Sequence, residues 1–235
     1  MDKKFYIELI FLVLLGCSTS LSLPPFNYLI INFFTLSLFF IFLVKKSQIN
    51  KNKKFFFIYG WLFGFGYFVS NLYWIPISLT FDKNLTFLIP IAMILLPAFL
   101  AIFYGLVSYL FVIFKTRKLL SSFFLFSLIF GLVEFIRGSI LTGFPWNLIA
   151  YSFSNQLEIL NIITIIGTYG FNLFCISLFV SPSLLILKNN KRDIVACIFF
   201  IFAIISFYIY GSQNIENFNK SKKNKYDYTI RIVGS

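Results

Sequence analysis

The chain has 235 residues, of which 59% are hydrophobic and 12% are charged. In a soluble domain roughly a quarter of the residues are charged, so this composition excludes an ordinary soluble fold. It predicts that lipid surrounds much of the chain. The formal net charge is +12, but the cations lie in clusters between apolar runs, and we expect no nucleic-acid partner. The chain contains no histidine, so we expect no metal site, no cofactor and no Ser-His-Asp triad.

Apolar runs of about 20 residues, the length that an α-helix needs to cross the hydrocarbon core, follow one another along the chain. They predict about seven transmembrane helices, at Phe5–Leu21, Phe26–Val44, Phe55–Ile77, Leu85–Phe114, Leu119–Arg137, Leu157–Leu187 and Ile194–Tyr210. The fourth and sixth exceed a perpendicular span, so we expect them to tilt, to kink at Pro90, Pro97 and Pro182, or to extend beyond the bilayer. No run alternates like a barrel strand, and the predicted fold is an all-α polytopic transmembrane bundle.

Lysine and arginine residues accumulate on one side of these predicted helices. Thirteen of them precede the first helix or lie between helices 2 and 3, 4 and 5, and 6 and 7, whereas the opposite short loops hold only Lys83 and Arg137. The positive-inside rule therefore predicts a cytoplasmic N-terminus and a tail after Tyr210 on the other side of the membrane.

The last part of the chain changes character. We expect residues 1–211 to form the transmembrane domain, residues 212–227 to be a polar juxtamembrane linker, and residues 228–235 to be the first strand of another domain, because Tyr228–Val233 alternates apolar and polar side chains. A single strand forms no sheet, so this segment either adds to a sheet of a partner or belongs to a fragment of a longer protein, and we favour the fragment.

The three cysteines, Cys17, Cys175 and Cys197, each lie within an apolar run without a nearby cation, which favours structural packing over reactivity. Leu14-Leu15-Gly16-Cys17 after Lys3-Lys4 also resembles a lipoprotein signal peptide, which would make Cys17 a lipidation site. The helices that follow, and Glu8 within the run, favour a first transmembrane helix instead.

The strongest local signal comes at the end of the fifth predicted helix. Glu134 and Arg137 are three residues apart, so they fall on one helical face and can pair. The pair can simply pin the helix end, with Trp146 as an interfacial anchor, or it can form a polar rim for a lipid headgroup or an external domain. The candidates for this outer mouth are Tyr73, Trp74, Glu134, Arg137, Thr142, Gly143, Phe144, Pro145 and Trp146.

The third predicted helix carries a second pattern. Gly60 and Gly64 are four residues apart and predict a smooth stripe where another helix approaches closely. Tyr73 and Trp74 then follow at the expected outer interface, where aromatic side chains with a polar end are enriched, and they can also shape an opening.

Three segments of the sequence together resemble the membrane domain of bacterial apolipoprotein N-acyltransferase. They are GWLFGFGYFVSNLYWIPISL (Gly60–Leu79), EFIRGSILTGFPWNLIAYSFSN (Glu134–Asn155) and IGTYGFNLF (Ile166–Phe174). The resemblance implies an inner-membrane helical domain that precedes a periplasmic nitrilase-like domain, whose opening strand is similar to Tyr228–Val233. It also implies a multi-pass protein with a periplasmic C-terminal tail.

The resemblance implies a two-step acyl transfer in lipoprotein biosynthesis. A cysteine, with a glutamate base and a lysine that stabilises the oxyanion, takes an acyl chain from a phospholipid donor as a thioester. It passes the chain to the N-terminal amine of a diacylated apolipoprotein acceptor. These three groups belong to the nitrilase-like domain, and no residue of this chain matches them. We therefore expect no catalytic residue here and no activity from the chain alone.

Two other functions remain open from the sequence. A small multi-pass transporter would place Glu134 and Arg137 on a conduction path, and it predicts further polar residues at the depth of the membrane midplane. A non-catalytic membrane platform, either a truncated product or half of a split enzyme, is compatible with the resemblance.

Overall fold

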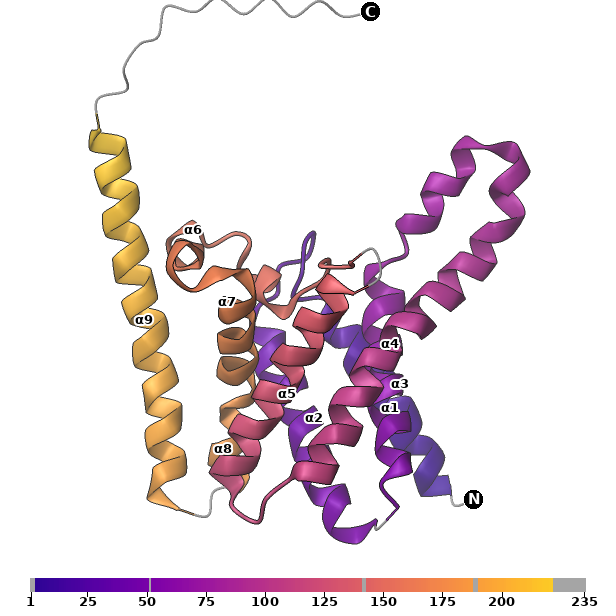
Figure 1. Cartoon of the computed structure of the whole chain (residues 1–235), viewed down its shortest axis with the longest axis horizontal. Helices are drawn as coiled ribbons and strands as arrows, with labels where there is room; N and C mark the ends of the chain where they lie inside the picture. Colours follow the sequence, from indigo (N-terminus) through magenta and orange to yellow (C-terminus); the bar gives the residue numbers. More distant parts are fainter. Residues whose placement is uncertain (1–2, 51, 141–142, 188–189, 222–235) are drawn as a thin grey trace, which may run out of the picture.

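The computed structural model describes residues 3–50, 52–140, 143–187 and 190–221, and all regular structure in these ranges is helical (Figure 1). The α-helices are α1 (Lys3–Ser20), α2 (Ile30–Ile49), α3 (Lys54–Asn71), α4 (Ile89–Phe114), α5 (Leu119–Ser139), α6 (Leu157–Leu160), α7 (Ile163–Val180), α8 (Pro182–Leu187) and α9 (Lys191–Lys220). The 3₁₀-helices are η1 (Ile75–Phe81), η2 (Lys83–Leu88) and η3 (Ile149–Phe153). The predicted all-α fold is confirmed.

Five helical segments of the described chain are long and apolar enough to cross a membrane. They are α2, Thr86–Phe114, α5, Ile163–Leu187 and α9, and α3 with η1 forms a sixth if this pair, bent by 46°, is one span. The apolar part of α1, Phe5–Ser20, is shorter than these segments. Each of the seven predicted helices therefore corresponds to a helical segment in the described chain, but only five or six of these segments are long and apolar enough to cross a membrane.

Two of the predicted helices are interrupted at proline and glycine. The third was expected to continue to Ile77, but α3 ends at Asn71 and the chain resumes as η1 with Pro76 in its first turn. The sixth is divided into α6, α7 and α8: Gly167 has a φ of 72° inside α7, and Pro182 begins α8. Proline lacks an N–H and glycine accepts a positive φ, which explains where these breaks occur.

The other two prolines leave α4 continuous. Pro90 lies in its first turn, where a missing N–H costs no hydrogen bond, and Pro97 lies inside the helix. At the other end of the chain, α9 continues to Lys220 rather than ending at Tyr210, so residues 212–220 of the predicted linker are helical. The predicted strand at 228–235 and the rest of the linker lie outside the described residues.

The centre of the bundle is built around α3, which packs between α1 and α4. A Cβ added at Gly60 would collide with the main-chain oxygen of Tyr104, and one at Gly64 would lie 2.7 Å from the Tyr104 Cβ. On the opposite side of α3, a Cβ at Gly66 would collide with the main-chain oxygen of Val13. The predicted close approach at Gly60 and Gly64 is confirmed, and the partner helix is α4.

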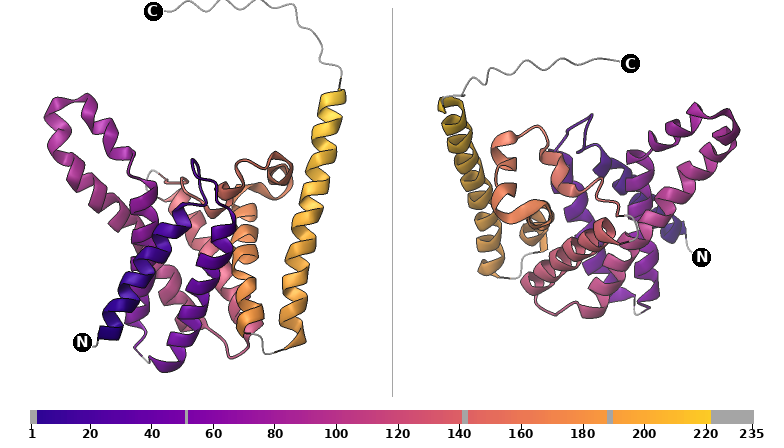
Figure 2. Two further views of the ribbon diagram at one scale, coloured as in Figure 1. Left: turned by 180° about the vertical axis from the view of Figure 1, so that it is seen from behind. Right: turned by 45° about the horizontal axis from the view of Figure 1, so that its top comes forward.

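The long helices run up and down, so alternate connections lie at opposite ends of the bundle (Figures 1 and 2). The start of α1, the α2–α3 and α4–α5 connections and the start of α9 lie at one end, which we call the lysine end. The opposite end, where α5 leads into residues 143–153, we call the Trp146 end. There η1, η2 and the first half of α4 project away from the other helices (Figure 2).

Candidate functional site at the Trp146 end

The side chain of Arg137 organises the Trp146 end of α5. Its Nη2 donates a hydrogen bond of 2.6 Å to Oε2 of Glu134, and both side chains are fully buried. Its Nη1 donates to the main-chain oxygens of Phe144, at 2.8 Å, and Trp146, at 3.0 Å. The i,i+3 pair predicted from the sequence is therefore present, and Arg137 also holds the segment that follows the helix.

A chain reversal after α5 brings residues 144–146 back to Arg137. Gly143 has a φ of 73°, in the left-handed region that favours glycine, and its N–H donates to the oxygen of Ile140 at 2.8 Å. The N–H of Phe144 then donates to the main-chain oxygen of Arg137 at 3.1 Å. The main-chain oxygen of Arg137 thus accepts from the N–H of Phe144, and its side chain donates to the oxygen of the same residue. These two bonds fix the turn against the helix.

Aromatic rings enclose the ion pair. The guanidinium of Arg137 lies 5.3 Å from the ring centroid of Phe68 and 5.9 Å from that of Phe144. The ring of Tyr104 on α4 packs edge to face against that of Phe68, with ring centroids 5.2 Å apart. A charge pair so deeply buried is tolerated because the two charges neutralise each other and cation–π contacts cover the guanidinium.

An apolar groove lies beside this pair, between the first half of α4 and the segment after α5. We call it the mouth groove; it is lined by Leu96, Phe99, Leu100, Phe103, Arg137, Ile140, Gly143 and Phe144. Its cavity volume is about 140 Å³. Arg137 is the one charged side chain in this lining, and its Nε is buried without a hydrogen-bond partner among the described residues.

The remaining predicted mouth residues that the structure describes lie outside the mouth groove. Trp74 and Trp146 contact each other edge to face, with ring centroids 6.4 Å apart, and both are about half exposed. Tyr73 lines a separate cavity of about 90 Å³ with Trp74 and Asn147. Pro145 is exposed, and Thr142 lies outside the described residues.

Three polar side chains of this site were missed from the sequence. Tyr67 on α3 donates from its hydroxyl to the main-chain oxygen of Asn147 at 2.8 Å. The fully buried Asn172 on α7 accepts from the N–H of Ala150 at 3.0 Å. Tyr104 and Tyr67 stack with ring centroids 5.7 Å apart. An asparagine inside an apolar helix was the available signal for Asn172, because a buried amide requires a partner.

No cysteine lines either cavity of this site among the described residues. Cys175 and Cys197 are buried inside helices and Cys17 is partly buried within α1. No cluster of potential metal ligands occurs in the described part of the chain. What the arrangement can do chemically is bind: it combines an apolar groove with a buried guanidinium and an exposed aromatic rim.

Comparison with known proteins places this geometry in a family. The model of the apolipoprotein N-acyltransferase N-terminal domain matches residues 15–181, which include α2–α5, α7 and the whole Trp146-end site. The chain is 33% identical over 195 residues to an apolipoprotein N-acyltransferase of Rhizobium etli, covering 80% of this chain and 36% of the relative. It is 36% identical over 182 residues to that of Rhodopseudomonas palustris, covering 74% and 33%.

A similarity to the apolipoprotein N-acyltransferase of Rickettsia prowazekii, at 31% identity over 229 residues, covers 97% of this chain and 44% of the relative. The chain thus spans between a third and a half of the length of these curated relatives. Both the family match and the span of the aligned residues include the buried pair, the turn at Gly143 and the two tryptophans. The chain belongs to the apolipoprotein N-acyltransferase family, as its N-terminal membrane domain.

Proposed function

We propose that this chain is the membrane part of an enzyme that transfers an acyl chain from a phospholipid to the N-terminal amine of a diacylated lipoprotein. In this proposal the protein lies in the bacterial inner membrane with the Trp146 end facing the periplasm. One observation carries it: a fully buried Glu134–Arg137 pair holds the turn at Gly143 against an apolar groove at one end of the bundle.

The mouth groove suits part of a lipid rather than a whole one. Its volume of about 140 Å³ is below the range of about 300–1,000 Å³ that is common for sites enclosing complete small ligands. Its lining is apolar except for Arg137, whose guanidinium has five N–H donors and uses three of them on Glu134, Phe144 and Trp146. A free N–H beside an apolar groove can donate a hydrogen bond to an ester or phosphate oxygen while a chain segment fills the groove.

The covalent steps require groups that this site does not supply. A thiolate must attack the phospholipid ester, break its acyl C–O bond and release a lysophospholipid to give a thioester. The lipoprotein amine must then displace the sulfur and lose a proton, which gives the amide and the free thiol. The buried cysteines of α7 and α9 are poor candidates, because a thiol in apolar surroundings is difficult to ionise. We therefore assign the nucleophile, its glutamate base and its lysine to a nitrilase-like part outside these 235 residues.

The experiment is lipoprotein acylation in a bacterial strain depleted of its own N-acyltransferase. One culture receives this chain alone, and another receives the chain extended at Ser235 by the nitrilase-like domain of a curated relative. Mass spectrometry of a reporter lipoprotein then reads the N-terminus. We expect a third acyl chain only with the extended protein.

Either of two results would contradict the proposal. Acylation by the chain alone would require a nucleophile within the described helices. Failure of an extended chain that is present in the membrane at the same level as an active relative would separate this membrane domain from the acyl-transfer function.

A further inference from the structure

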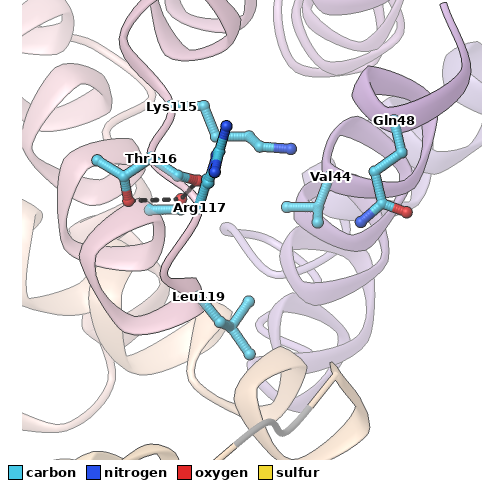
Figure 3. Close-up of a pocket in the computed structure, with 7 residues that line it drawn as sticks. Val44, Gln48, Lys115, Thr116, Arg117 and Leu119 are labelled. Carbon is cyan, nitrogen blue, oxygen red and sulfur yellow. Dashed lines mark hydrogen bonds between the residues drawn. The ribbon is translucent and has the colours of Figure 1, made fainter.

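A second cavity lies at the lysine end, far along the bundle from the mouth groove. We call it the basic pocket; it is lined by Val44, Gln48, Lys115, Thr116, Arg117, Leu119 and Ser122 (Figure 3). It opens between the last turns of α2 and the α4–α5 connection, and its volume is about 320 Å³. This volume is within the range of sites that hold small ligands, and it exceeds that of the mouth groove.

Hydrogen bonds fix the α4–α5 connection that forms one wall of the pocket. The hydroxyl of Ser122 on α5 donates to the main-chain oxygen of Thr116 at 2.9 Å, and the Thr116 hydroxyl donates to that of Lys118 at 3.1 Å. The ammonium of Lys115 crosses to α2 and donates to the hydroxyl of Ser47 at 2.5 Å. The pocket is thus formed by an ordered connection rather than by loose surface chains.

The positive charge of the pocket is not neutralised by the described residues. Neither Lys115 nor Arg117 has a carboxylate within ion-pairing distance in the described ranges, whereas Lys46 on α2 pairs with Glu8 at 2.5 Å. Lys115 is half-buried, and this burial lowers the pKa of its ammonium. An anion in the pocket would offset the cost of burying that charge, and a phosphate group matches the fork of an arginine beside a lysine.

We propose that the basic pocket binds the phosphate group of an anionic phospholipid at the lysine end of the bundle. Phosphate oxygens would contact Lys115 and Arg117, which both line the cavity. The walls formed by Val44 and Leu119 are apolar, and Phe114, the last residue of α4, exposes 59% of its surface next to the pocket. This junction of apolar helix ends and cations is where headgroups of a bilayer lie, and basic pockets between transmembrane helices bind such headgroups.

The proposal does not rest on the acyl-transfer function, because the pocket shares no residue with the mouth groove. It predicts selectivity for lipid charge. The test measures binding of dioctanoyl phosphatidylglycerol and dioctanoyl phosphatidylcholine to the purified chain in a neutral detergent. Inorganic phosphate is titrated in parallel to distinguish a lipid headgroup from a free anion. We expect binding of the anionic lipid at least about tenfold tighter than that of either other probe, as the charged contacts predict.

Matched variants assign the binding to the pocket. The double substitution Lys115→Gln and Arg117→Gln should weaken phosphatidylglycerol binding at least about tenfold. The double substitution Lys53→Gln and Lys54→Gln removes the same charge from exposed positions at the same end, outside the pocket lining, and should change it less than about twofold.

Two further variants leave the charge of the pocket unchanged, and they separate a loss of binding from a loss of folding. Gln48→Trp, at an exposed position of the pocket lining, should fill the cavity and weaken binding without changing the charge. Lys115→Arg should retain binding, with helix content and elution volume unchanged in every variant. Equal losses in the two double variants, unchanged binding in Lys115→Gln/Arg117→Gln, or equal binding of inorganic phosphate would each overturn the proposal.

Discussion

At the scale of single residues, the guanidinium of Arg137 connects α5 to the segment that follows it. It joins Glu134 and the oxygens of Phe144 and Trp146, all at 3.0 Å or less. A lysine at this position has a single nitrogen and could not reach three acceptors in this planar arrangement. The residue therefore serves both the charge balance and the shape of the mouth groove.

Removing the Arg137 cation alone should lower the free energy of unfolding more than removing both charges of the pair. We expect Arg137→Leu to lower the free energy of unfolding by about 3–5 kcal/mol, because the Glu134 carboxylate stays buried without its partner. The double variant Glu134→Leu/Arg137→Leu should recover part of this loss. Thermal and denaturant unfolding in detergent, followed by circular dichroism, measure both values.

The exposed Glu216–Lys220 pair at the end of α9 provides the control for Arg137. Substitution of Lys220 by leucine should cost less than about 1 kcal/mol, because exposed ion pairs contribute little. If Glu134→Leu/Arg137→Leu is as unstable as the sum of its single variants, the two charges do not compensate each other and the interpretation of the pair is wrong.

The sequence predicted part of this site and could not predict the rest. The i,i+3 spacing was sufficient to pair Glu134 with Arg137, because helical geometry alone places both on one face. The bonds from Arg137 to residues 144 and 146 depend on the reversal at Gly143, and those of Tyr67 and Asn172 join segments far apart in the chain. Spacing within one helix contains no information about such contacts.

At the scale of secondary structure, glycines set how closely α3 approaches its neighbours. Gly60 and Gly64 contact α4, while Gly66 contacts α1 on the other side. In lipid, where no hydrophobic force distinguishes a helix partner from an acyl chain, such close packing is a main source of helix association. These contacts position Tyr67 and Tyr104 next to the buried ion pair.

A Gly60→Ala substitution tests this packing. The added methyl group would collide with the main-chain oxygen of Tyr104, and overpacking of this kind costs about 1–3 kcal/mol. Gly170→Ala in α7 is the matched control, since its Cβ would meet the Ile166 side chain at an ordinary 3.5 Å. We expect the control to be neutral or to stabilise the protein, as alanine favours a helix over glycine.

Unfolding midpoints of the two alanine variants, measured under one detergent condition, test whether the α3–α4 contact at Gly60 limits stability. An equal effect of the two substitutions would mean that helix propensity, and not the α3–α4 contact, determines the outcome. The sequence predicted the close approach at Gly60 and Gly64, the break at Pro182, the end of α4 at Phe114 and the start of α5 at Leu119. It did not predict the breaks at Pro76 and Gly167, because these two residues interrupt an apolar run without changing its hydropathy.

At the scale of the whole molecule, the distribution of charge predicts the orientation in the membrane. The start of α1 and the end of α9 lie at opposite ends of the bundle, and the basic connections gather at the lysine end (Figure 1). The positive-inside rule predicts that this end lies in the cytoplasm. In our proposal the mouth groove and the end of α9 then both face the periplasm.

Reporter fusions measure this orientation. Alkaline phosphatase fused after Asp82 or Ser221 should be active, because the enzyme folds only outside the cytoplasm. The same reporter fused after Asn50 or Arg117 should be inactive, and green fluorescent protein at those two sites should fluoresce. The reverse pattern would invert the bundle and move the mouth groove to the cytoplasmic side.

We propose that a lipid chain enters at the mouth groove, and one rate measurement tests this role most directly. In the chain extended by a nitrilase-like domain, Leu96→Trp fills the groove from a half-buried position, while Leu106→Trp alters an exposed position elsewhere on α4. We expect the first to slow lipoprotein acylation at least about tenfold, consistent with lost substrate positioning, and the second to change it less than about twofold. Equal rates for both variants and the parent, at equal amounts in the membrane, would contradict a role of the mouth groove in acylation.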